Sequence, residues 1–295
     1  MAFRCTAASL ARGEPVLGSA STVRALLLVE NTGPWGEEAL RDARFPDDVR
    51  AHLQSAAGVG VRVLLVRRHR TTAGPGVRVF AAYAHPHAPW LESATLPDAE
   101  GLLDLDLAAL GRGRSLGLAP ADAPVFCVCT HGRHDACCAE LGRPAAAAMS
   151  LAHPELTWEV SHVGGDRFAA NVLVLPDGLY YGRVGATDAA GLVDRHLGGH
   201  LDLDLLRGRS GFGFPVQVAE IAVRREAGET RTRALRLVSA TRTGDDTAVV
   251  LAVGDTTYDV LVRRTTDPQP HRLSCRAARE NLAPAYEVVS LTSVA

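Results

Sequence analysis

Short apolar runs of strand length recur along the first two hundred residues, each bounded by glycine, proline or small polar residues. They occupy residues 26–30, 61–66, 125–128 and 171–175. Such runs between turn signals are typical of buried strands. Pro176-Asp177-Gly178 separates the last run from Leu179-Tyr180-Tyr181, a pattern that predicts a β-hairpin.

Helical stretches lie between these runs. Thr187 is placed to cap the start of a helix that ends near Leu197, where Gly198-Gly199 supplies the stop. Pro144 is placed at the first position of a helix over the Ala-rich residues 145–152. Strands that alternate with helices predict an α/β fold.

Beyond residue 207 the pattern changes. A helical pattern over Val216 to Arg224 precedes two strand-like runs, 248–253 and 256–264, with the turn residues Gly254-Asp255 between them. Nothing in this part of the chain has the spacing of a catalytic site. We expect a small α+β segment here.

The chain also repeats itself. Leu-Asp-Leu-Asp-Leu occurs at 103–107 and again at 201–205, an offset of 98, and each copy is followed by Arg-Gly-Arg-Ser, at 112–115 and 207–210. The same offset places the apolar run 26–30 opposite 124–128. Strand therefore corresponds to strand, and we expect two tandem α/β domains of about a hundred residues each, followed by a third segment.

Composition narrows the setting. The chain has 295 residues, 47% of them apolar, and a net charge of −2, so it can bury ample core and offers no basic face for nucleic acid. No apolar run is long enough to span a membrane, and the amino terminus has no uninterrupted apolar segment. Four of the six cysteines lie between 127 and 138, unlike a secreted disulfide framework, so we expect a cytoplasmic protein with reduced thiols.

Four residues from two loops form a candidate metal site. Cys129 and Cys138 follow the apolar run 125–128, and His162 and Asp166 follow a second predicted strand and flank Gly164-Gly165. Both pairs can converge at the carboxyl ends of neighbouring strands, where α/β sheets usually place their sites. Thiolate selects iron–sulfur clusters, zinc or copper(I), and imidazole suits iron and zinc. We therefore expect these four residues to bind a metal, and we expect that metal to be iron.

Two stretches carry a resemblance to a known family. They are Cys129-Thr-His-Gly-Arg-His-Asp-Ala-Cys-Cys138 and the segment Ser161 to Val184, which opens Ser-His-Val-Gly-Gly-Asp-Arg-Phe. With Cys5, Ser19 to Val23 and Gly33-Pro34-Trp35-Gly36, the chain resembles the bacterial branch of the sucrase/ferredoxin-like family, whose site-bearing domain is a thioredoxin-like ferredoxin.

The resemblance gives each part of the chain an expected fold. It implies a degenerate thioredoxin-like domain over 1–118, a thioredoxin-like [2Fe-2S] ferredoxin domain over 119–207, and the small α+β domain over 208–295. At the offset of 98, Cys129 matches Asn31, His162 matches Leu64 and Asp166 matches Arg68. The first copy is therefore expected to be scaffold, and the second to carry the site.

The resemblance further implies an electron-transfer protein. Its [2Fe-2S] cluster would be held by Cys129 and Cys138 as one pair and by His162 and Asp166 as the other, and a redox partner protein would exchange electrons with it. The family fills the second pair with two cysteines, or in fungal relatives with His-x-x-x-His, so Asp166 departs from that chemistry. The chain is expected to be a redox carrier rather than an enzyme with its own substrate.

Several alternatives stay open. Cys127 or Cys137 could replace Asp166 as the fourth ligand. The same residues could bind zinc in a structural or hydrolytic domain. A metal-free thioredoxin-like thiol protein is a third reading, although the usual Cys-x-x-Cys at a helix start is absent. His131 and His134 either donate hydrogen bonds to cluster sulfurs or belong to a solvated loop, and Cys5 and Cys275 are expected to be structural.

Overall fold

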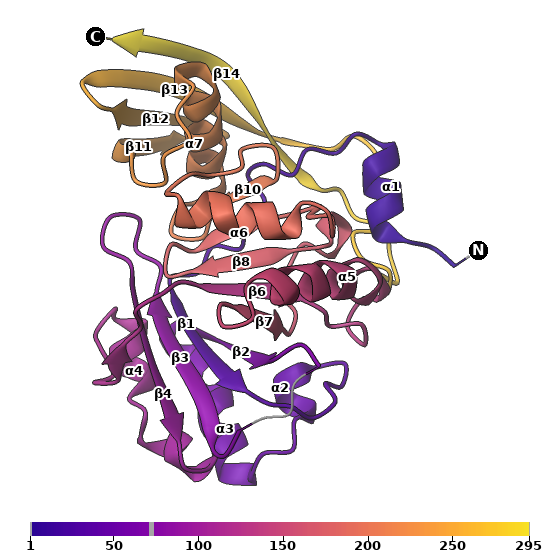
Figure 1. Cartoon of the computed structure of the whole chain (residues 1–295). Helices are drawn as coiled ribbons and strands as arrows, with labels where there is room; N and C mark the ends of the chain where they lie inside the picture. Colours follow the sequence, from indigo (N-terminus) through magenta and orange to yellow (C-terminus); the bar gives the residue numbers. More distant parts are fainter. Residues whose placement is uncertain (1, 71–73, 295) are drawn as a thin grey trace.

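The computed structural model describes residues 2–70 and 74–294 (Figure 1). Most of the chain builds one sheet with the strand order β10-β9-β8-β6-β7-β2-β1-β3-β4-β5. Its strands are β1 (Ala25–Glu30), β2 (Val61–Arg67), β3 (Val77–Tyr83), β4 (Trp90–Leu96), β5 (Ala119–Pro120), β6 (Val125–Cys129), β7 (Thr157–Val160), β8 (Val172–Leu175), β9 (Leu179–Tyr181) and β10 (Leu206–Arg209). The protein is thus a mixed α/β fold with a large sheet, as the sequence predicts.

Helices connect these strands. They are α1 (Cys5–Ala11), α2 (Ala39–Asp42), α3 (Asp47–Ser55), α4 (Leu107–Gly111), α5 (Ala136–Ala152), α6 (Ala189–Leu197) and α7 (Phe214–Ala227), with short 3-10 helices η1 (Ala56–Val59), η2 (Glu100–Asp104) and η3 (Asp166–Phe168). Among the described residues, no helix is long and apolar enough to cross a bilayer.

The two halves of the large sheet repeat one topology. β1 is parallel to β2 and antiparallel to β3, and β6 is parallel to β7 and antiparallel to β8. In each half two further antiparallel strands continue to the sheet edge. The halves join where β2 pairs antiparallel with β7, so both belong to one continuous sheet.

The strand register corrects the constant offset of 98. Glu30 is paired with Val66, Cys129 is paired with Val160, and Val66 pairs with Val160 across the junction. Glu30 and Cys129 each end their strand, and Leu28 faces the shared core as Cys127 does, so the equivalent of Cys129 is Glu30, not Asn31. The offset is 99 between β1 and β6 but 94 between β2 and β7, because the helical connections between the strands differ in length in the two halves.

Helix α5 begins earlier than the sequence pattern suggests. The prediction that Pro144 opens a helix is wrong, because Pro144 lies inside α5, which starts at Ala136 after the N-cap Asp135. The Asp135 side chain accepts a hydrogen bond from the Cys137 backbone N–H at 2.9 Å, which is the usual N-cap contact. Cys137 and Cys138 consequently lie in the first helical turn. The predicted helix ending at Leu197 is confirmed as α6, but its N-cap is Asp188 and not the predicted Thr187.

Side chains on alternate positions of β6 face opposite sides of the sheet. Val125, Cys127 and Cys129 join a core shared by both halves, whereas Phe126 and Val128 join a second core beneath α5 and α6. Cys129, the last residue of β6, thus lies at the edge of the shared core where the strand ends.

The carboxyl-terminal segment forms a second sheet against α7 (Figure 1). Its strands, in the order β11-β12-β13-β14, are β11 (Leu235–Thr243), β12 (Asp246–Val253), β13 (Thr256–Thr266) and β14 (Pro284–Val294). The predicted helix and both predicted strands are confirmed in α7, β12 and β13. The connection between β13 and β14, residues 267–283, leaves this sheet and returns to the start of α5, where Cys275 contacts Cys137.

Candidate metal centre

Cys129 and Cys138 meet across the loop that joins β6 to α5. Cys129 ends the strand, Cys138 lies in the first turn of the helix, and each is 1% exposed. The two thiols are close enough for Cys138 to lower the pKa of Cys129. Gly142, one turn along α5, allows this approach, because a Cβ there would lie 2.0 Å from the Cys129 carbonyl oxygen.

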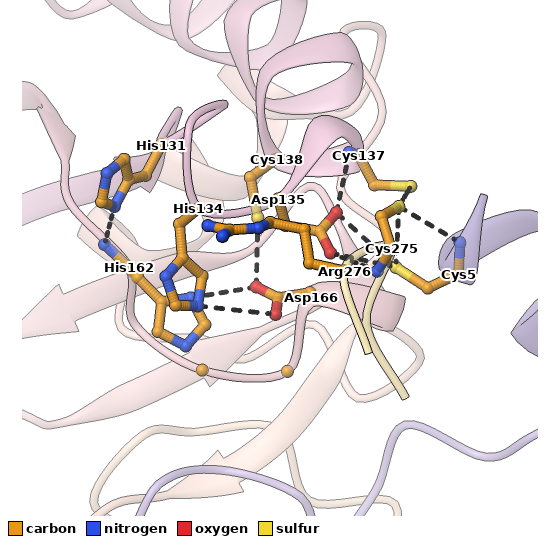
Figure 2. A network of polar contacts seen from close by, with 12 residues as sticks. Cys5, His131, His134, Asp135, Cys137, Cys138, His162, Asp166, Cys275 and Arg276 are labelled. Atoms are coloured by element: carbon orange, nitrogen blue, oxygen red, sulfur yellow. Dashed lines mark hydrogen bonds and ion pairs between the residues drawn. The ribbon is translucent and has the colours of Figure 1, made fainter. Parts of the chain in front are cut away.

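His162 and Asp166 lie on the loop that follows β7. Gly164 and Gly165 between them have φ values of +94° and +78°, which favour glycine, and they turn the loop so that His162 Nδ1 lies 2.9 Å from Asp166 Oδ1. Cys138 Sγ lies 3.4 Å from the same oxygen. The structure therefore brings Cys138, His162 and Asp166 together (Figure 2). Cys129 lies close enough to Cys138 and His162 for both to lower its pKa.

His134 belongs to the same group, although we expected it only to hydrogen-bond cluster sulfurs or to lie in a solvated loop. Its ring stacks on that of His162 with centroids 3.8 Å apart, and its Nε2 lies 3.9 Å from Asp166 Oδ2. One donor atom each from His134, His162 and Asp166 lie within 4.8 Å of one another. His134 is thus a further candidate ligand.

Neighbouring charges set the protonation of this group. Contact with Cys138 and then His162 lowers the pKa of Cys129 well below its ordinary value, whereas contact with Cys129 and burial raise the pKa of Cys138. Burial alone would lower the pKa of His162, but the adjacent Asp166 and Cys129 outweigh it and raise that pKa to about 9. Burial opposes ionisation of Asp166, yet His162 lowers its pKa. The pocket thus favours the thiolate form of Cys129 and the carboxylate form of Asp166.

One polar atom in the pocket lacks an aligned partner. His162 Nδ1 is buried and makes no hydrogen bond of acceptable geometry, although it lies close to Asp166. A buried polar atom without a hydrogen bond is costly. Two thiols, a carboxylate and an imidazole fit an iron–sulfur cluster or a single metal ion.

A buried arginine holds the Gly-Gly loop in place. Arg207, in β10, is 1% exposed and donates to the Gly164 carbonyl at 2.9 Å and to Asn171 Oδ1 at 2.7 Å. Asn171 in turn donates to the Gly165 carbonyl at 2.9 Å. Sequence reasoning used Arg207 only as part of a repeated motif. Its strand, Leu206–Arg209, carries two arginines and a glycine, so no pattern in the sequence singles out Arg207.

The loop after β1 covers the cysteine loop. His131, 2% exposed, donates from Nε2 to the Gly36 carbonyl at 2.6 Å, and its Nδ1 accepts from the His162 backbone N–H at 3.3 Å. Trp35 packs its ring edge-on against His131, with centroids 5.8 Å apart. Both ring nitrogens of His131 are thus occupied, so neither a hydrogen bond to cluster sulfur nor a solvated loop describes this residue. It positions the loop.

The two alternative cysteines lie elsewhere. Cys127 lies two residues before Cys129 in β6 and is fully buried in the shared core. Burial raises the pKa of its thiol. Cys137 Sγ lies 3.4 Å from Cys275 Sγ, in a separate group with Cys5 and Asp135. Sequence reasoning missed this second group, because its members come from three distant segments.

Comparisons with known proteins agree with the resemblance seen in the sequence. A sequence model of the sucrase/ferredoxin-like family matches residues 16–208. Two solved structures are similar to part of the chain, the Cys55Ser and Cys59Ser variants of the thioredoxin-like [2Fe-2S] ferredoxin from Aquifex aeolicus. They are 22% and 23% identical, and each match covers 28% of this chain and 97% of the ferredoxin with a TM-score of 0.26. The comparison with curated proteins found no match.

Proposed function

Because the chain belongs to the sucrase/ferredoxin-like family, we propose that it is an electron-transfer protein with a [2Fe-2S] cluster in its second half. Cys129 and Cys138 would hold one end of the cluster, and His162 and Asp166 the other. When bound, such a cluster accepts and donates single electrons. The observation that carries the proposal is the meeting of two buried thiols with the His162–Asp166 pair at the ends of neighbouring strands.

The residues of the chain supply two further requirements of a carrier. Cys129 and Cys138 are shielded from solvent, whereas the His162 side chain is 27% exposed. A redox partner protein would therefore approach the histidine side of the pocket. A carrier needs no substrate cavity, and a pocket of about 1060 Å³ includes Trp90, His196 and Arg231 in its lining but none of the four proposed ligands.

The repeated topology supports a tandem origin. The strand order and directions of the first half match those of the second, and we infer two thioredoxin-like units, over 1–118 and 119–207, joined through β2 and β7. Only the second unit carries the proposed ligands.

Anaerobic purification with iron and acid-labile sulfide analysis tests the proposal. Wild-type protein should be red-brown with equal amounts of iron and sulfide, and Cys129→Ser and His162→Ala should lose both. Cys127→Ser is the matched control, since Cys127 is equally buried but lies outside the pocket. Colourless wild-type protein without sulfide would refute the cluster.

The fourth ligand needs its own comparison. Loss of iron in Asp166→Ala with retention in His134→Ala would assign the carboxylate. The reverse pattern would assign His134, whose ring stacks on that of His162. Retention in both variants would contradict a second ligand pair built on this loop.

A single zinc ion is the second candidate for this pocket. The donor atoms of His134, His162 and Asp166 lie within 4.8 Å of one another, as one ion with Zn–N and Zn–O bonds of about 2 Å requires. Colourless protein whose zinc is lost in His162→Ala would favour this reading over the cluster.

A further inference from the structure

A second group of metal-ligand side chains lies on the other side of the first turn of α5. Cys275 Sγ is 3.4 Å from Cys137 Sγ and 3.6 Å from Cys5 Sγ. The Asp135 carboxylate lies 3.7 Å from Cys5 Sγ. One donor atom from each of the four residues lies within 4.8 Å of the other three (Figure 2).

The sulfur separations match a shared metal ion better than a disulfide. A disulfide bond is about 2.05 Å long, and all six cysteines of the chain are free. Three thiolates on a tetrahedral ion with Zn–S bonds of about 2.3 Å are separated by about 3.8 Å. The observed 3.4 and 3.6 Å need only a small expansion to reach that geometry. A disulfide between any two of these residues would also leave the third thiol and the carboxylate unused.

Burial and hydrogen bonding also suit a closed structural site. Cys5, Cys137 and Asp135 are at most 2% exposed. Asp135 accepts from the backbone N–H groups of Cys137 and Cys275, which leaves a lone pair on each carboxylate oxygen, and the Cys5 N–H donates to Cys275 Sγ at 3.5 Å. Hydrogen bonds that orient ligand atoms are typical of metal sites. The N-terminus of the 17-residue helix α5 further offsets the negative charge of the group.

The position of the group explains what an ion would stabilise. Its three cysteines come from helix α1, helix α5 and the connection 267–283, and the apolar cluster around them is small, comprising Cys5, Cys137 and Ala169 with Phe3 and Cys275 at its edge. So few apolar groups stabilise a long connection only weakly, whereas an ion bound by three segments would crosslink them.

We propose that Cys5, Cys137, Cys275 and Asp135 bind one zinc ion, which fastens helix α1 and the connection 267–283 to the start of helix α5. Each thiol gives up its proton to solvent as its sulfur binds the ion. This site shares no ligand with the proposed cluster, although Cys137 and Cys138 are neighbours in the chain. It stands independently of the proposed electron-transfer function.

The test measures zinc and iron in the full-length protein and in single variants. Wild type should contain about one zinc ion per chain that is not removed by desalting, and Cys275→Ser and Cys5→Ser should lower the zinc content about tenfold or more. Cys129→Ser should lose iron and keep zinc, which separates this site from the first. Zinc retained in both Cys275→Ser and Cys5→Ser, or absent from wild type, overturns the proposal.

A second measurement needs no variant to fold. Zinc-edge X-ray absorption on wild-type protein should show three sulfur ligands at about 2.3 Å and one oxygen. Two sulfurs with nitrogen would place the zinc at Cys129, Cys138 and His162 instead and overturn the proposal. A Cys137–Cys275 or Cys5–Cys275 disulfide in protein isolated without reductant would overturn it as well.

Discussion

The two halves of the large sheet fold alike and carry different chemistry at equivalent positions. Where the second half has Cys129 at the end of its central strand, the register places Glu30 in the first half, and where the second half has His162 the first has Arg68. Arg68 lies 3.9 Å from the ring of Trp158 and donates to backbone carbonyls. The same strand order therefore serves as scaffold in one copy and as a candidate metal centre in the other.

The loops after the central strands differ in a complementary way. The loop after β6 presents thiols, whereas the loop after β1 presents Trp35 and a carbonyl that fixes His131. The first half thus covers the site of the second.

Arg207→Ala should have the largest effect, because the two Arg-Gly-Arg-Ser copies have opposite environments. Arg207 is buried and bonded to Gly164 and Asn171, so its loss leaves several buried acceptors unsatisfied and should cost about 3–5 kcal/mol of unfolding free energy. Arg112, its counterpart in the first copy, is exposed, and Arg112→Ala should change stability by less than about 0.5 kcal/mol. Urea unfolding of both variants measures this, and equal losses would contradict the assigned role.

Gly165→Ala should have the next largest effect. Gly165 and Gly60 share φ = +78°, but a Cβ on Gly165 would lie 2.3 Å from the Arg207 guanidinium, whereas nothing lies within 4 Å of one on Gly60. Gly60→Ala should cost about 1 kcal/mol from backbone strain alone, and Gly165→Ala about 2–3 kcal/mol. Iron analysis beside urea unfolding should show metal loss only in Gly165→Ala. If both variants keep their iron, the Gly-Gly loop does not position a ligand.

The sequence predicted the features that local pattern determines, namely the buried strands and the residues at their ends. Apolar runs ending in turn residues located Cys129 and His162 at neighbouring strand ends, and those ends do meet. It could not place Arg207 against the Gly-Gly loop or Cys275 against Cys5. Those contacts join residues 43 and 270 positions apart and depend on how the halves and the second sheet pack. Pro144 was misplaced for the same reason. A proline is usually a start signal, but burial of Ala145, Ala146 and Met149 keeps the helix continuous through it.

Glu159→Gln should weaken the junction between the halves. Glu159 in β7 accepts from Arg67 Nε at 2.9 Å and from Thr130 at 2.9 Å, and contacts His69 at 2.7 Å. The variant should lose about 1–2 kcal/mol at neutral pH. The exposed Glu155, 3.6 Å from Arg68, is the control, and Glu155→Gln should lose less than about 0.5 kcal/mol.

The junction should also respond to pH in a defined direction. Burial opposes the charge of Glu159, but His69 and Arg67 hold its pKa below the ordinary 4.5. A folded pKa that is lowered contributes stability above the unfolded value and loses it as pH falls through the folded value. The difference between wild type and Glu159→Gln should thus be constant near neutral pH and shrink below about pH 4.5. A difference that grows on acidification would contradict this.

Trp35→Phe should have the smallest effect on stability and a specific effect on the metal. Trp35 donates to the Asn31 carbonyl at 3.2 Å beneath Arg67, and Trp90 makes the comparable contact to Gly113 at 3.3 Å, away from the site. Each Trp→Phe change should cost about 1 kcal/mol. Only Trp35→Phe weakens the packing against His131 beside the site. A chelator should therefore remove iron a few-fold faster from that variant than from wild type or Trp90→Phe. Equal rates of iron release from wild type, Trp35→Phe and Trp90→Phe would contradict this role. The loop after β1 would then pack against the cysteine loop without shielding the metal.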